Sequence, residues 1–142
     1  MLTISDEKIK DIAESINAGL ICYYHIKTGD IISFPDPDKW LGVDEEEFEE
    51  ELKNIEEDIE NYIVFEGMET HESFRVMEDF ANSVDDRKIQ VKLFDALNRR
   101  KPFANFKNII NDTINIRQNW FNFELMKNIE FVKMQIELHN LE

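Results

Sequence analysis

The stretch LICYYHIKTGDIISF, residues 20–34, decides the fold of the amino-terminal half of the chain. Two runs rich in β-branched and aromatic residues flank the polar tetrapeptide KTGD. Because its glycine, Gly29, takes the positive φ angle of a tight turn without steric cost, the pattern predicts a β-hairpin. Pro35 and Pro37 follow, and proline has no N–H to donate to a neighbouring strand, so we expect them to end the second strand.

Helical patterns lie on both sides of this hairpin. Residues 5–18 are predicted to form a helix with Ser5 as N-cap, since apolar residues repeat there at helical spacing, and Gly19 ends it. After the hairpin, residues 44–60 predict one amphipathic helix, capped by Asp44. Its apolar positions are Phe48, Leu52, Ile55 and Ile59.

The short apolar run at residues 62–65 is rich in strand formers and predicts a third strand. With the hairpin it gives a three-stranded antiparallel sheet. Every later pattern is helical, so the fold class is α+β, with a small sheet in the amino-terminal half and a cluster of helices after it.

Four further helices are expected in that cluster. Thr70 is the predicted cap of the first, Asp85 or Asp86 caps the second, and Pro102 suits the first turn of the third. The last helix is expected to run from about residue 113 or 114 toward Leu138.

Length and composition favour one folded domain over residues 1–142, because a chain of this size can bury a single core. Cys22 is the only cysteine, so an internal disulfide is excluded and a reducing compartment is expected. No apolar run has the length of a signal peptide or a membrane span. We therefore expect a cytoplasmic protein that does not bind membranes.

The formal net charge is −15, and it is unevenly spread. Residues 87–120 contain 8 Lys and Arg against 2 Asp, or +6, which leaves −21 for the rest of the chain. An acidic excess repels nucleic-acid phosphates and disfavours generic nucleic-acid binding. The glutamate-rich helix at residues 44–60 has two interpretations, a solvated helix face or a surface for a basic partner.

Sequence signatures of catalysis are missing. There is no HExxH or CxxC metal motif, no glycine-rich phosphate loop and no nucleophile elbow. Asp36 and Asp38 begin like a calcium loop, but the glycine such a loop needs at its sixth position is replaced by Leu41. His71 is either an exposed first-turn residue or an imidazole tuned by a helix N-terminus. We expect no enzyme activity, cofactor or metal.

The most basic short stretch, RRKPFANFK at residues 99–107, also has two interpretations. Cations at the end of one helix are favourable beside its unpaired carbonyls, with the phenylalanines in the core. The alternative is a site that binds RNA or another anion. We call its five candidate residues the basic segment: Arg99, Arg100, Lys101, Lys107 and Arg117.

Aromatic residues at the start of the last helix suggest an interface. Trp120, Phe121 and Phe123 are the candidate contact residues for a protein partner or for self-association. The leading hypothesis is thus a non-enzymatic interaction or regulatory module, and the alternative is RNA or anion binding by the basic segment. The leading hypothesis rests on the expectation that the aromatic rings between positions 94 and 131 are buried together, whereas Phe103 and Phe106 exposed around an open cationic cleft would favour ligand binding.

Several short stretches follow one another in an order that is typical of a known family. They are YY at 23–24 with TGDI at 28–31, YI at 62–63, F74 with MEDF at 77–80, AL at 96–97, PFxxFK at 102–107, and RxxWF at 117–121. This order resembles uncharacterised bacterial protein family zero-one-five-eight (UPF). The resemblance implies a cytoplasmic protein and supplies no activity, substrate or catalytic residue. Phe121 stands where the family pattern usually has tyrosine, and residues 64–67 stand where it has a proline-containing turn.

Overall fold

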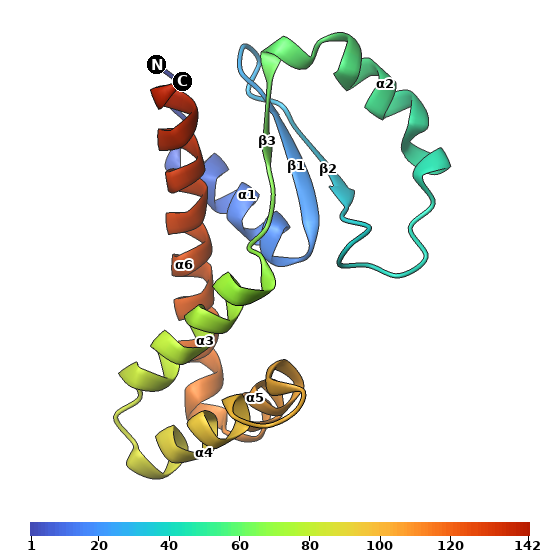
Figure 1. Cartoon of the computed structure of the whole chain (residues 1–142). Coiled ribbons are helices and arrows are strands. Elements are labelled where there is room, and N and C mark those ends of the chain that lie inside the picture. Colours follow the sequence, from blue (N-terminus) through green and yellow to red (C-terminus); the bar gives the residue numbers. More distant parts are fainter. The chain divides into compact units, whose positions relative to one another are not determined.

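The computed structural model describes residues 1–142 and divides them into two compact units. Unit 1 consists of residues 1–67 and 128–142, and unit 2 of residues 68–127. The last helix, α6 (Ile114–Leu141), contributes to both. The fold class is α+β, as predicted, with a three-stranded antiparallel sheet in the amino-terminal half and most of the helices after it (Figure 1). The single domain stays a prediction.

Unit 1 begins with α1 (Asp6–Asn17), whose predicted cap is confirmed because the Ser5 hydroxyl accepts a hydrogen bond from the Lys8 N–H. The helix buries one apolar face, and Gly19 follows it with φ at 85°. Only glycine adopts that angle readily, so the chain reverses there into the first strand.

The predicted hairpin is confirmed. Strands β1 (Leu20–His25) and β2 (Ile31–Pro35) pair in antiparallel register, with Gly29 at φ 77° in the turn. The third strand, β3 (Tyr62–Phe65), pairs with the other edge of β1, which gives the order β2-β1-β3.

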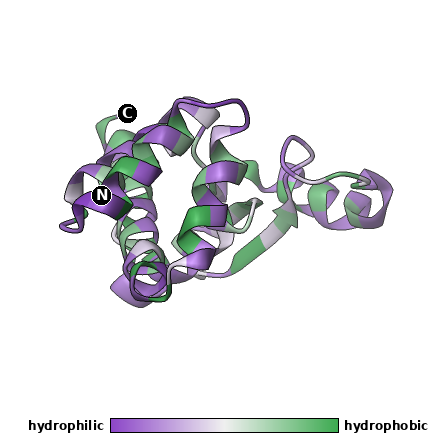
Figure 2. Ribbon diagram, turned by 90° about the horizontal axis from the view of Figure 1, so that it is seen from below, coloured by the Kyte–Doolittle hydropathy of each residue, from purple (hydrophilic) through white to green (hydrophobic).

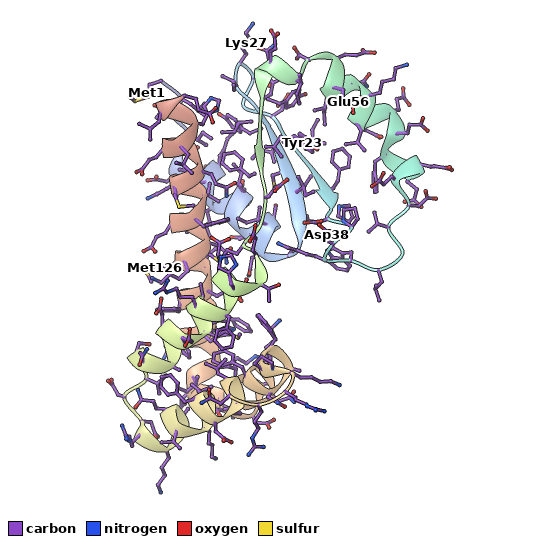
Figure 3. All side chains as sticks on the ribbon, in the orientation of Figure 1. Met1, Tyr23, Lys27, Asp38, Glu56 and Met126 are labelled. Atoms are coloured by element: carbon purple, nitrogen blue, oxygen red, sulfur yellow. The ribbon has the colours of Figure 1, made fainter.

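The two faces of the sheet have different environments. Cys22 and Tyr24 alternate with Tyr23 along β1, and Cys22 and Phe65, opposite each other, are both fully buried. Figure 1 shows α1 and the carboxyl-terminal part of α6 to one side of the strands and α2 to the other. Tyr23 lies between the strands and α2 (Figure 3), with its ring 5.8 Å from that of Phe34.

The prediction of a single helix over residues 44–60 is wrong. A 3-10 turn, η1 (Glu45–Phe48), precedes α2 (Glu49–Glu57), and a second 3-10 turn, η2 (Ile59–Asn61), follows it. Asp44 does cap this segment, accepting from the Glu46 N–H at 3.0 Å. The helix ends at Glu57, and the carboxylate of the next residue, Asp58, is hydrogen-bonded to His25 and Asn61. Ile55 is 2% exposed, whereas Ile59, expected on the same buried face, is 48% exposed.

The Phe48 ring explains the first break in this segment. It packs edge-to-face on Phe34 with ring centroids 5.2 Å apart, and the tighter 3-10 turn carries the chain from that contact into α2. The turns of α2 are coloured mainly as hydrophilic in Figure 2, in keeping with its many glutamates.

Unit 2 is a helical cluster made of α3 (Thr70–Ser83), α4 (Arg87–Leu97), α5 (Pro102–Asp112) and the start of α6. Asp86 caps α4, as predicted, and accepts from the N–H groups of Lys88 and Ile89. The prediction that Thr70 caps α3 is wrong by one residue. Glu69 is the N-cap of α3, because its side chain and that of Glu72 form a reciprocal capping box.

The core of unit 2 is aromatic at its centre. The Trp120 ring lies 5.2 Å from Phe80 and 4.9 Å from Phe106, in edge-to-face geometry. Phe106 is fully buried and Trp120 is 4% exposed. The expectation that these rings are buried together is confirmed for this pair, whereas Phe121 is 43% exposed.

Lys101 is the one non-glycine residue with a positive φ angle, at 54° with ψ 57°. A side chain in this left-handed region costs about 1 to 2 kcal/mol relative to a right-handed conformation, and glycine avoids most of that cost but loses more entropy on folding. We therefore expect Lys101→Gly to raise the free energy of unfolding by about 0.5 to 1 kcal/mol, measured by urea denaturation.

The matched control is Lys107→Gly, which places glycine inside α5. That variant should lose about 1 kcal/mol, because glycine is unfavourable in a helix interior. A Lys101→Gly variant that is less stable than the parent would contradict the strain assigned to this turn.

Candidate functional site

Three residues of the basic segment lie in the turn between α4 and α5. Asn98 is the C-cap of α4, and Arg99, Arg100 and Lys101 follow it with exposed side chains. An Arg99 guanidinium nitrogen, Nη2, lies 2.8 Å from an Asp95 carboxylate oxygen. The cations therefore stand at a helix carboxyl end, as one of the two interpretations predicted.

The other two cations of the basic segment come from different helices. Lys107 is exposed on α5, and Arg117 is exposed near the start of α6. The Arg117 guanidinium carbon lies 5.6 Å from the centre of the Phe121 ring, within the range of a cation–π contact.

The three aromatic interface candidates are placed differently. Trp120 belongs to the core of unit 2, and Phe123 is partly buried with its ring 5.4 Å from Phe80. Phe121 alone of the three has an exposed side chain. The structure therefore does not bring these residues together as one accessible patch.

Unit 2 has an open hollow of about 640 Å³ between the first turns of α3 and α5. It is lined by Glu69, Thr70, His71, Phe74, Pro102 and Phe103. Ligand atoms of Glu69, His71 and Glu72 lie within 4.8 Å of one another, so these three residues are the ones that could hold a metal ion. The two carboxylates already form the capping box of α3, and His71 is exposed, which explains the cluster without a ligand.

In unit 1, His25 and Asp58 form a pair that sequence spacing did not suggest. The His25 Nε2 atom lies 3.1 Å from the Asp58 carboxylate. The other ring nitrogen of His25, Nδ1, accepts hydrogen bonds from the backbone N–H groups of Lys27 and Thr28. These contacts fix the tautomer with the proton on Nε2. Hydrogen bonds from Asn61 and then from His25 hold the pKa of the Asp58 carboxyl below its usual value.

Both ring nitrogens of His25 thus have structural partners: Nδ1 binds the hairpin turn and Nε2 binds Asp58. The Cys22 thiol is also enclosed, and the Ser33 hydroxyl oxygen lies 3.2 Å from its sulfur. This burial raises the pKa of the thiol above its usual value. A buried thiol with a raised pKa is a poor nucleophile.

Charge divides between the two units. Unit 1 has 6 Lys and Arg against 22 Asp and Glu, 6 minus 22 or −16, and unit 2 has 10 against 9, or +1. Together these give the −15 of the whole chain. Unit 1 therefore holds all of the acidic excess.

Comparison of the sequence with known proteins gives a family match. The sequence model described as Uncharacterised protein family (UPF0158) matches residues 5–138. The chain belongs to this family. A relative from Pseudomonas aeruginosa, named UPF0158 protein PA5073, is 27% identical over 70 residues, which are 49% of this chain. The match spans 46% of the length of that relative. No solved structure matches the chain.

The residues that carried the resemblance to UPF0158 are largely structural. Phe106 and Trp120, from its PFxxFK and RxxWF stretches, are buried in the core of unit 2, and Gly29 forms the hairpin turn. Phe121, which replaces the usual tyrosine of UPF0158, is exposed. The family is uncharacterised, so the activity of this chain has to be inferred from its surface.

One surface feature of this UPF0158 member was missed in the sequence. Its residues lie on the carboxyl-terminal part of α6, and the signal that marks them is their 3-4-3 spacing, the repeat of a helix seam. No helix of the chain combines the length and apolar character needed to cross a membrane. We call this feature the α6 stripe: Phe131, Met134, Leu138 and Leu141.

Proposed function

We propose that this protein is a non-enzymatic interaction module that binds a partner helix through the α6 stripe. The observation that carries the proposal is the exposure of three apolar side chains on one helix. Met134 is 43% exposed, Leu138 is 53% exposed and Leu141 is 82% exposed. Exposed apolar residues that form a continuous line favour association, because burial removes their surface from water.

The geometry of α6 supports this proposal. Val132 and Ile136 are buried in unit 1, and Met134 lies two residues from each. Two residues correspond to a rotation of about 200° around a helix, so Met134 points away from the side that unit 1 covers. The stripe therefore lies on the solvent side of a helix whose other side is already packed.

The spacing of the stripe indicates the kind of partner. Positions 131, 134, 138 and 141 follow the alternating steps of three and four residues that align apolar residues along a helix–helix seam. The matching partner is an amphipathic helix, from a second copy of this chain or from another protein. The enclosed Cys22 thiol and the doubly bonded His25 ring support a binding role over a catalytic one.

A crosslinking experiment tests the proposal. A photoreactive amino acid is placed at Leu138, on the stripe, or at Lys133, which is exposed on another side of the same helix. We expect crosslinks from position 138 to a second copy or to a specific partner protein. Sedimentation velocity at increasing concentration then separates these two outcomes, since self-association raises the mass.

The matched substitutions are Leu138→Gln and Val91→Gln. Both remove an exposed apolar side chain, and Val91 lies on α4 with 54% exposure. Only Leu138→Gln should abolish the crosslinked or associated species. Equal crosslinking from positions 133 and 138, together with a constant monomer mass, would refute the α6 stripe as an interface.

A further inference from the structure

The helices α4 and α5 form a helix–turn–helix pair. Each has 11 residues, and only residues 98–101 join them. Lys101 redirects the chain with its left-handed backbone, and the Asn105 side-chain amide donates to the Arg100 carbonyl oxygen at 2.7 Å. The pair is packed on α3 through a shared core that includes Leu93 and Phe106. A turn of three or four residues between two packed helices occurs in αα-hairpins and in DNA-binding helix–turn–helix units.

The exposed side of α5 carries groups that bind nucleic acid. Ala104, Lys107, Asn108 and Asn111 are exposed and lie at positions i, i+3, i+4 and i+7, which is one face of the helix. Asparagine amides form paired hydrogen bonds with adenine in the major groove, and lysine contacts phosphates or guanine. The only carboxylate of α5, Asp112, is its last residue.

The amino-terminal end of α5 favours a phosphate. No side chain caps this helix, and Pro102 has no N–H. The N–H groups of Phe103 and Ala104 have no partner within the helix, since the first intrahelical bond runs from the Asn105 N–H to the Lys101 carbonyl. Three exposed cations, at positions 99–101, precede these amides. Amides and cations at one helix start attract anions.

We propose that this protein binds double-stranded DNA, with the exposed face of α5 in the major groove and the turn at residues 98–101 on the phosphate backbone. The major groove is about 12 Å wide and admits an α-helix, whereas the deep, narrow major groove of A-form RNA does not. Single-stranded RNA is read mainly by stacking on exposed rings. Here Phe106 and Trp120 are buried, which leaves one exposed Phe or Trp ring in unit 2, Phe121, in contact with Arg117. A single exposed ring gives single-stranded RNA less to stack on than the run of rings in a stacking platform.

The net negative charge of the chain does not prevent DNA phosphates from binding near the turn at residues 98–101. Residues 87–120 carry +6, whereas unit 1 carries −16. Salt screens exposed charges beyond about 8 Å at physiological ionic strength, so the charges nearest a bound phosphate dominate its energy. The Arg99–Asp95 pair is exposed and can exchange for a phosphate contact.

The test measures binding of the full chain to random-sequence DNA duplexes of about 20 base pairs, two helical turns, by fluorescence anisotropy between about 50 and 200 mM salt. We expect affinity that falls with salt. The triple variant Arg99→Gln, Arg100→Gln, Lys107→Gln should reduce the slope of log affinity against log salt by about 1 for each phosphate that is no longer neutralised.

The matched control also replaces three exposed lysines, but in unit 1: Lys10→Gln, Lys53→Gln and Lys133→Gln. It has the same net charge as the triple variant and should bind DNA like the parent. Asn108→Ala should leave the salt slope unchanged and alter preference among duplex sequences. The proposal is overturned by the absence of duplex binding at the lowest salt, by equal weakening in the control, or by tighter binding of single- or double-stranded RNA of equal length.

Discussion

Trp120→Ala is expected to lower the free energy of unfolding by about 3 to 5 kcal/mol, the range for removing a large buried aromatic side chain. The ring is 4% exposed and is in edge-to-face contact with Phe80 and Phe106. Its loss would leave a cavity at the centre of the unit 2 core, whose walls come from several helices and can close only partly.

The adjacent residue provides the control for this variant. Phe121→Ala removes a ring that is 43% exposed, so its effect on stability should stay within about 0.5 kcal/mol. Urea denaturation followed by far-UV circular dichroism measures both. A loss below about 1 kcal/mol for Trp120→Ala, or an equal loss for the two variants, would show that position 120 is not in the core. Any loss of binding by Trp120→Ala has to be separated from unfolding before it is assigned to an interface.

Ile55→Ala is expected to cost about 2 to 5 kcal/mol, which is large for a helix as polar as α2. Ile55 is 2% exposed and is the only buried residue of that helix. The remaining surface of α2 is mostly carboxylate, and like charges one turn apart on a helix repel. The packing of α2 against the rest of unit 1 therefore depends heavily on this one side chain.

Ile59→Ala is the matched control, since both changes remove the same atoms from the same segment. Ile59 is 48% exposed in the 3-10 turn η2, and its loss should change stability by less than about 0.5 kcal/mol. Thermal and urea denaturation of the two variants give the comparison. Equal losses would instead support the continuous helix over residues 44–60 that the sequence pattern suggested.

The elements that could be predicted from sequence are those whose cause is local. The glycine of the hairpin turn, the caps Ser5, Asp44 and Asp86, and the proline at the start of α5 each act within a few residues. Their positions are confirmed, and so is the three-stranded sheet, because strand patterns and turn residues agree there.

The features that were missed depend on contacts between distant parts of the chain. At Asp58, where α2 ends, the carboxylate is bound by the nearby Asn61 and by His25, 33 residues away, and the sequence around Asp58 does not predict the distant contact. Trp120 looked like an interface residue because aromatic residues serve cores and surfaces alike. Its burial is decided by α3 and α5, which contribute Phe80 and Phe106. The α6 stripe has the spacing of a helix seam in the sequence, but its exposure depends on which side of α6 packs in unit 1, where Val132 and Ile136 are buried.

The enclosed sulfur atom of β1 has a practical consequence. Cys22 is the chain's sole cysteine and is fully shielded, so a thiol reagent added to the native protein has one target and no path to it. Modification then requires transient local openings that separate β1 from its neighbours. The modification rate depends on how often these openings expose the thiol. The rate at which Cys22 is modified in the wild-type chain therefore measures local opening of the sheet, without an introduced cysteine.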